Sequence, residues 1–447
     1  MKKIQLGLVL TLICFVAAAL HAQQPAAAAQ DSAIMRAKAF VDLLSTRQNA
    51  ACVEYFDSTM KAVMPVGKVG EAWDSVLVRM GPFKKQVRAW SQRYRIYDIV
   101  FVTCLFEKDS ADVRVVLDEK RRVAGLFFSK PLTPVDYKAP AYVKQETFRE
   151  ESVLVGSGKW TLHGTLTMPV NASSCPAIVL VHGSGPNDRD ETIGPNKPFK
   201  DLAWGLASNG IAVVRYEKRT REHASDLMEL RYTMTVKEET IDDALAAVQL
   251  LRRYKQIDPK RIYVLGHSLG GMLAPRIGAQ DSSLAGLVIL AGATRPLEDI
   301  LVDQTTYLLS VSALSPMAQS YQVARIDSER VKVKNLKLAD SSSKDSYFAA
   351  PASYWLDLQG YDPPQLALSL KMPMLILQGE RDYQVTKKDY ERWTAALQGR
   401  ANVTFKTYPK LNHLFFAGEG QSLPKEYEKT EHVIGEVIDD IVRWIKR

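Results

Sequence analysis

Residues 261–271, RIYVLGHSLGG, place one serine between glycines directly after an apolar run. Gly266 and Gly270 flank Ser268 in the pattern Gly-x-Ser-x-Gly, in which a strand turns sharply into a helix. Glycine at both positions leaves room for the turn, because a side chain there would collide with neighbouring backbone. We therefore expect the hydroxyl of Ser268 at the tip of the turn, placed as a nucleophile. The alternative is a glycine-rich packing turn that contains an ordinary serine.

A serine hydroxyl is a poor nucleophile near neutral pH unless a base removes its proton. His413 lies in TYPKLNHLFF, a loop after a late predicted strand, where a base at the sheet edge is expected. His267 is inside the Gly-x-Ser-x-Gly turn, and we expect its ring to point away from the serine. The remaining histidines are less well placed: His21, His163, His182, His223 and His432.

A third group must orient the imidazole and stabilise its charged form. The stretch LILQGERDYQV offers Glu380 and Asp382 after an apolar run. We assign the role to Asp382, because Glu380 directly follows the glycine that ends the strand and has less reach around the turn. Glu298 and Asp299, which follow the preceding predicted strand, are the alternative acids.

Attack on a carbonyl group creates an oxyanion, which needs preorganised N–H donors. The backbone N–H of Leu269 is one candidate, because unpaired donors face outward at a helix start. The loop HGSGPNDRD supplies a second candidate in the N–H of Ser184. Gly183 and Gly185 let the backbone of this loop approach the oxyanion closely.

The composition indicates neither a metal site nor a nucleic-acid site. Asp188 and Asp190 have no histidine at ligand spacing, and no Cys-x-x-Cys pair occurs, so we expect no metal and no other cofactor. The net charge of +8 includes no run of Lys or Arg that predicts a nucleic-acid groove. Segments that mix both signs, such as EKRTRE at residues 217–222, predict solvated loops.

The N-terminus predicts export. Two lysines precede an apolar run at residues 6–20, and Ala22 follows as a small residue, which is typical of a signal peptide over residues 1–22. A retained anchor is the alternative, but about 20 apolar residues are needed to span a bilayer. We expect a periplasmic or extracellular bacterial protein without stable membrane insertion. In that compartment Cys52 and Cys104 would form a disulfide or remain free buried thiols.

The predicted elements fall into two groups. Helical spacing followed by alternating strand patterns predicts a small α+β domain at residues 31–130. A proline-containing linker follows at residues 131–150. From 151 to 447, apolar strands alternate with helices, which predicts a mostly parallel sheet with helices on both faces. Residues 296–365 interrupt this alternation and are expected to form a helical cap over the sheet edge.

Five segments together resemble the α/β-hydrolase superfamily: VLVHGSGP, RYEKRT, GHSLGG, LILQGERDYQV and NHLF. The resemblance covers about residues 150–447 and extends to secreted bacterial esterases and serine-aminopeptidase-like hydrolases with a small extra N-terminal domain. The sharp turn that carries the nucleophile, called the elbow, matches at Ser268, and the loop that donates to the oxyanion, called the oxyanion loop, matches at Ser184. The acid matches at Asp382 and the base at His413. Residues 31–130 resemble the domain of unknown function found ahead of such hydrolases, with an NTF2-like or cystatin-like character.

The resemblance implies hydrolysis of small-molecule carboxylic esters without a cofactor, while the fold leaves the substrate and the oligomeric state open. A peptidase would need an acidic anchor for the substrate ammonium, for which Glu298, Asp299 and Asp303 are candidates. A thioesterase and a non-catalytic envelope-binding protein are the further alternatives. Four cap residues would either line an acyl pocket or pack within the cap: Leu308, Leu309, Tyr354 and Trp355.

Overall fold

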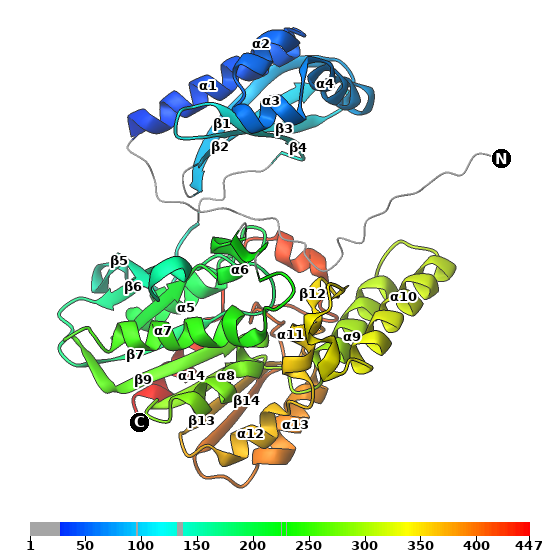
Figure 1. Cartoon of the computed structure of the whole chain (residues 1–447). Helices are drawn as coiled ribbons and strands as arrows, with labels where there is room; N and C mark the ends of the chain where they lie inside the picture. Colours follow the sequence, from blue (N-terminus) through cyan, green and yellow to red (C-terminus); the bar gives the residue numbers. More distant parts are fainter. Residues whose placement is uncertain (1–26, 95–96, 132–136, 225, 229) are drawn as a thin grey trace. The chain divides into compact units, whose positions relative to one another are not determined.

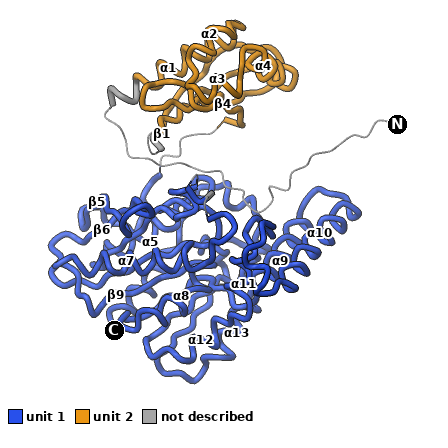
Figure 2. The backbone as a smooth tube through the Cα atoms, viewed as in Figure 1, with its two compact units in different colours: residues 1–18, 137–447 blue, residues 19–136 orange. Residues whose placement is uncertain are grey.

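The computed structural model describes residues 27–447 apart from 95–96, 132–136, 225 and 229 (Figure 1). The predicted signal peptide lies outside the described residues. The described chain forms two compact units, one ending at Asp136 and the other beginning at Tyr137 (Figure 2).

The N-terminal unit consists of helices followed by an antiparallel meander, which confirms the predicted α+β domain. Its elements are α1 (Ala27–Ser45), α2 (Asn49–Glu54), α3 (Ser58–Val63), α4 (Val66–Met80), β1 (Phe83–Tyr94), β2 (Tyr97–Phe106), β3 (Ser110–Leu117) and β4 (Val123–Ser129). The sheet order is β1-β2-β3-β4, and one sheet face packs against helix residues such as Phe40 and Trp73. Cys52 and Cys104 are free thiols in this core, and burial raises their pKa values to about 11 and about 12.

The second unit is built on an eight-stranded sheet in the order β14-β13-β10-β9-β7-β8-β6-β5. The strands are β5 (Phe148–Val155), β6 (Leu162–Pro169), β7 (Cys175–Val181), β8 (Ala212–Tyr216), β9 (Ile257–His267), β10 (Gly286–Leu290), β13 (Met374–Gly379) and β14 (Val403–Tyr408). Only the β5–β6 and β6–β8 pairs are antiparallel. The mostly parallel sheet predicted from the alternating pattern is confirmed.

Helices cover both faces of this sheet and create two apolar cores. They are α5 (Pro198–Ala207), α7 (Asp242–Leu251), α8 (Leu269–Gln280), α13 (Lys387–Leu397) and α14 (Gly435–Ile445). In β7, Val179 packs on the α7–α8 side, while its neighbours Ile178 and Leu180 pack on the α5–α14 side. Because both faces are buried, these strands are apolar at successive positions rather than alternating.

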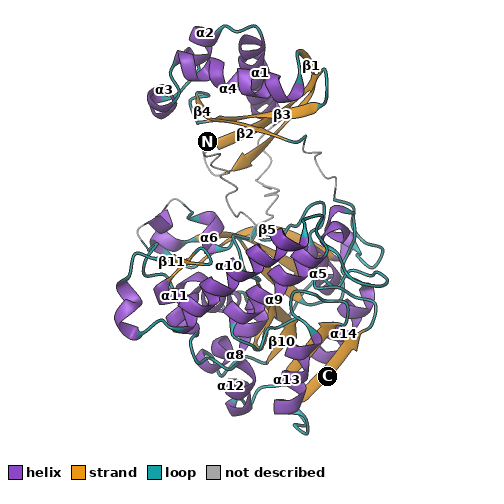
Figure 3. Ribbon diagram, turned by 90° about the vertical axis from the view of Figure 1, so that its right-hand side faces the viewer, coloured by secondary structure: helices purple, strands orange, loops and turns teal. Residues whose placement is uncertain are grey.

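A helical insertion joins β10 to β13 at the place predicted for the cap (Figure 3). It contains α9 (Leu297–Ser310), α10 (Pro316–Lys334), β11 (Ser346–Tyr347), β12 (Ala350–Pro351), α11 (Ala352–Leu358) and α12 (Pro363–Ser369). Helices α9 and α10 lie side by side, whereas α11 packs Tyr354 and Trp355 into the core on the α7–α8 side. None of the helices in the described part of the chain is long and apolar enough to cross a membrane.

Candidate active site

Ser268 occupies a strained turn between β9 and α8. Its backbone has φ 53° and ψ −114°, a left-handed conformation that costs a non-glycine residue about 1–3 kcal/mol. A β-carbon on Gly266 would lie 2.1 Å from the carbonyl oxygen of Gly270, and one on Gly270 would lie 2.3 Å from that of Val181. The turn therefore requires both glycines, and it leaves the half-buried Ser268 at its tip.

The structure brings the predicted base and acid together. His413 Nδ1 lies 2.6 Å from Asp382 Oδ2, and both side chains are almost completely buried. The second carboxylate oxygen of Asp382 accepts the backbone N–H groups of Gln384 at 2.7 Å and Val385 at 3.0 Å. These bonds fix the carboxylate, which in turn fixes the orientation of the imidazole.

The alternative acids are engaged elsewhere. Glu380 is exposed and accepts the hydroxyl of Thr407 at 2.7 Å. Asp299 pairs with Lys334 at 2.8 Å, within the cap insertion. The imidazole of His413 therefore contacts Asp382 rather than either of these carboxylates.

Ser268 and His413 lie at the same edge of the sheet, although no hydrogen bond joins the serine hydroxyl to the imidazole among the described residues. The ring of His267, the residue before the serine, has its centroid 4.6 Å from that of His413. Its Nε2 lies 3.0 Å from the carbonyl oxygen of His413. Catalytic hydrogen bonds are often long in substrate-free enzymes and shorten when substrate binds.

Sequence reasoning missed a buried pair formed by Glu191 and His267. Glu191 Oε2 lies 2.8 Å from His267 Nδ1, and Glu191 Oε1 accepts the N–H of Gly183 at 2.6 Å. Burial alone would lower the pKa of His267, but the Glu191 carboxylate more than offsets it, so the pKa is raised. Since Nε2 of His267 also contacts the carbonyl oxygen of His413, the pair connects the 183–191 loop, the turn at Ser268 and the loop that carries His413.

The two predicted oxyanion donors lie beside the elbow. A β-carbon on Gly183 would be 3.2 Å from the β-carbon of Ser268, so this backbone lies closer to the nucleophile than most residues with a side chain could. The N–H of Leu269 is at the first residue of α8. Neither this N–H nor that of Ser184 is paired with an acceptor in the described structure.

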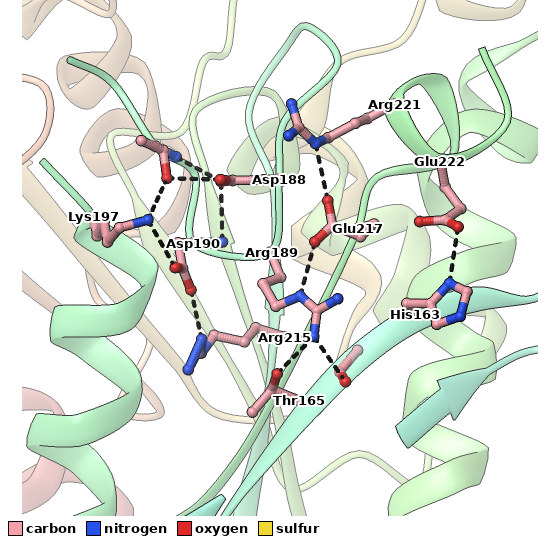
Figure 4. A network of polar contacts seen from close by, with 12 residues as sticks. His163, Thr165, Asp188, Arg189, Asp190, Lys197, Arg215, Glu217, Arg221 and Glu222 are labelled. Carbon is pink, nitrogen blue, oxygen red and sulfur yellow. Dashed lines mark hydrogen bonds and ion pairs between the residues drawn. The ribbon is translucent and has the colours of Figure 1, made fainter. Parts of the chain in front are cut away.

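Asp188 and Asp190 pin the loop that carries Ser184 and are not solvated (Figure 4). Asp188 accepts the backbone N–H of Thr192 at 2.8 Å. Asp190 pairs with Lys197 at 3.1 Å and with Arg215 at 2.5 Å. No group of three or more His, Cys, Asp or Glu that could hold a metal ion occurs among the residues the structure covers.

The predicted solvated loop at residues 217–222 is wrong. The carboxylate of Glu217 lies 2.8 Å from the guanidinium of Arg189 and 3.0 Å from that of Arg221 (Figure 4). Glu217 and Arg221 are buried, whereas Arg189 is partly exposed. Residues Arg219–Glu222 form the short helix α6, and Lys218 is only 2% exposed. The mixed signs of this segment reflect internal pairing rather than solvation, because buried charges are tolerated when each has a partner.

His182, which directly follows β7, is expected to make the second unit sensitive to acid. Burial lowers the pKa of its ring to about 4 from an ordinary 6.5, and its Nε2 donates to the carbonyl of Asp188 at 3.0 Å. As the pH falls, His182 is protonated in the unfolded state near pH 6.5 but in the folded state only near pH 4. The free energy of unfolding therefore decreases as the pH falls from 6.5 towards 4. We expect a loss of about 3 kcal/mol from this group between pH 7 and pH 4.

The variant His182→Gln checks this expectation, because its amide nitrogen lies close to the position of the imidazole Nε2 and can still donate to the carbonyl of Asp188. Urea unfolding of both proteins at pH 7, 5.5 and 4 should show a shallower acid dependence for the variant. Parallel dependences would contradict the assignment.

A cavity of about 540 Å³ adjoins the acid loop, between that loop and the cap insertion. Its lining includes Asp303, Tyr307, Asp382, Tyr383 and Ser422. The rings of Tyr307 and Tyr383 stack with centroids 4.6 Å apart. The lining includes none of the four predicted pocket residues: Leu308, Leu309, Tyr354 and Trp355. Of these, Tyr354 and Trp355 pack into the core on the α7–α8 side of the sheet.

Comparisons with known proteins match both units. Residues 174–420 match the family model described as serine aminopeptidase, S33, and residues 37–126 match a protein family of unknown function, DUF3887. Esterase EstD of Thermotoga maritima is 40% identical over 406 residues, which cover 91% of this chain and 93% of the esterase.

Two solved structures of lower similarity are Est1E and a peptidase. Est1E from Butyrivibrio proteoclasticus is 17% identical, with a TM-score of 0.43. The match covers 66% of this chain and 99% of the Est1E chain. A puromycin-hydrolyzing peptidase from Mycobacterium tuberculosis is 16% identical, with a TM-score of 0.43. The match covers 81% of this chain and 47% of the peptidase chain. The family match and the extended identity to EstD carry the assignment: the chain belongs to the serine aminopeptidase S33 family of the α/β-hydrolase superfamily.

Proposed function

We propose that this chain is an exported serine hydrolase that cleaves small-molecule carboxylic esters through an acyl-enzyme. The observation that carries the proposal is the 2.6 Å contact between the buried Asp382 and Nδ1 of His413, next to the elbow of Ser268. This contact leaves Nε2 of His413 as the ring nitrogen that can take a proton from the serine. The name of the relative EstD supports an ester as the substrate.

In the proposed reaction, Ser268 Oγ attacks the acyl carbonyl while His413 Nε2 accepts its proton. The oxyanion is stabilised by the N–H groups of Ser184 and Leu269, and Asp382 stabilises the imidazolium. The bond to the leaving oxygen breaks, and His413 donates the proton to the departing alcohol. Water then attacks the acyl-enzyme by the same proton transfers, which releases the acid and restores Ser268.

Peptidase activity is the second candidate, because the family takes its name from an aminopeptidase. The contacts of the carboxylates that could bind the substrate ammonium disfavour peptidase activity. Asp299 pairs with Lys334, and Asp303 pairs with Arg295 at 2.6 Å. Burial raises the pKa of Glu298, because the apolar surroundings disfavour its charged form.

An aminoacyl ester compared with its N-acetylated counterpart tests the choice. An esterase without an ammonium anchor should show kcat/KM values for the two that agree within about threefold, a difference below 1 kcal/mol. An aminopeptidase should prefer the free amine at least about tenfold, or 1.4 kcal/mol, and should also cleave aminoacyl anilides. The thioester of the same acyl group, measured in parallel, tests the thioesterase alternative.

A further inference from the structure

The peptide group between Gly183 and Ser184 is held by a buried lysine. The carbonyl oxygen of Gly183 accepts from Lys218 Nζ at 2.8 Å and from Asn187 Nδ2 at 3.3 Å. This peptide is trans, so its carbonyl and its N–H point in opposite directions. Anchoring the Gly183 carbonyl on Lys218 therefore fixes the direction in which the N–H of Ser184 points.

The preceding peptide group is held as well. Glu191 accepts the N–H of Gly183 at 2.6 Å, so buried side chains fix both peptides that flank this glycine. A β-carbon on Gly183 would point towards Ser268 and lie 3.2 Å from its β-carbon, so the space that a side chain would fill at Gly183 borders the serine. A small rotation of the second peptide would therefore turn the Ser184 donor away from the position of an oxyanion on the serine adduct.

Lys218 is itself positioned by two residues from elsewhere in the chain. Its Nζ lies 3.1 Å from Oε1 of Glu239, and Oε2 of Glu239 accepts the hydroxyl of Tyr354 at 2.9 Å. Glu239 lies in a single π-helical turn, Lys237–Ile241, before α7, and such turns are frequent at functional sites. Tyr354 comes from α11 of the cap insertion, and none of the three residues is more than 6% exposed.

We propose that Lys218 is a positioning residue for the oxyanion donor at Ser184, and that Glu239 and Tyr354 hold it in place. The proposal rests on the proposed function, because it assigns a task within that reaction. A preorganised donor needs no reorganisation when charge develops in the transition state. These contacts also connect the cap insertion to the oxyanion loop. A shift of α11 would therefore change the position of Lys218 and the direction of the Ser184 N–H.

The test uses the double variant Lys218→Met/Glu239→Gln, because removing one member of a buried pair would strand the other charge. The glutamine retains an acceptor for Tyr354. The matched control is Arg219→Met/Asp243→Asn, which removes the neighbouring buried pair, joined by two hydrogen bonds, without a contact to the oxyanion loop. Circular dichroism and thermal unfolding establish that each variant is folded at the assay temperature.

We expect the Lys218 double variant to lose about 10- to 100-fold in kcat with KM within about threefold, since loss of a whole oxyanion donor costs 10²–10³-fold. The inhibition constant of an alkyl boronic acid, which forms a tetrahedral adduct with the serine, should rise in parallel. Inhibition by the product alcohol should stay unchanged, because this neutral ligand places no negatively charged oxygen at the Ser184 and Leu269 donors. The control should keep kcat and the boronate constant within about threefold of the wild type.

Equal losses in the two double variants, or a fall in kcat without weaker boronate binding, would overturn the role of Lys218. If the double variant does not fold, the single variant Glu239→Gln decides the question, because its amide oxygen can still accept from Lys218 Nζ and so leaves the lysine a partner while it weakens the hold on it. A loss of kcat of threefold or more with a parallel rise in the boronate constant supports the role, and unchanged values exclude it. Absence of Ser268-dependent ester turnover in the wild-type protein would instead contradict the proposed function.

Discussion

Replacing Ser268 with alanine is expected to lower kcat for an aryl ester by about 10⁵-fold or more, as when a serine hydrolase loses its nucleophile. The fold should persist, because alanine keeps the β-carbon and the hydroxyl is at a turn tip outside both apolar cores. The rate of p-nitrophenol release from a short-chain acyl ester measures the effect, and circular dichroism checks the fold.

Ser369→Ala is the matched control, since this exposed serine lies at the end of α12. The control should retain the wild-type rate. Near-native turnover by Ser268→Ala would mean that another group is the nucleophile.

The variant Asp382→Asn is expected to lower kcat by about 10⁴-fold, because the amide no longer selects the imidazole tautomer that leaves Nε2 free as a base. The loop should keep its shape, since the remaining carbonyl oxygen can accept the N–H groups of Gln384 and Val385 as the carboxylate does. Steady-state kinetics of the purified full-length protein measure the loss.

Glu380→Gln is the comparison for this prediction, because Glu380 lies on the same loop and contacts Thr407 instead of the imidazole. We expect its kcat to stay within about threefold of the wild type, because substitutions of exposed residues outside the core and the active site usually have small effects. A harmless Asp382→Asn together with a crippling Glu380→Gln would reverse the assignment of the acid.

The parts of the site that follow from local spacing could be predicted from the sequence. The turn at Ser268 is dictated by two glycines within five residues, since steric exclusion acts between near neighbours in the chain. Asp382 followed from its place just beyond a buried strand, because carboxyl ends of parallel strands gather at one sheet edge. The mostly parallel sheet followed from the continuous apolar strands in the same way.

The parts that depend on pairing between distant segments could not be predicted. Lys218 and its charged neighbours have the composition of a surface loop, and only their partners in the 183–191 loop, α7 and its preceding turn make burial tolerable. Glu191 and His267 stand 76 positions apart in the numbering and meet only because β7 and β9 are adjacent in the sheet. The state of Cys52 and Cys104 was likewise open, because composition and compartment suit both a disulfide and free thiols.

Ser268 is the proposed nucleophile, activated where the turn at Ser268, the loop that carries His413 and the loop that carries Ser184 meet. Labelling of the full-length protein with a fluorophosphonate, followed by peptide mapping in a mass spectrometer, tests it most directly. We predict one adduct, on the peptide that contains Ser268, and no adduct in the Ser268→Ala protein. Active ester hydrolysis with no adduct on Ser268, or with the adduct on another residue, would contradict the account.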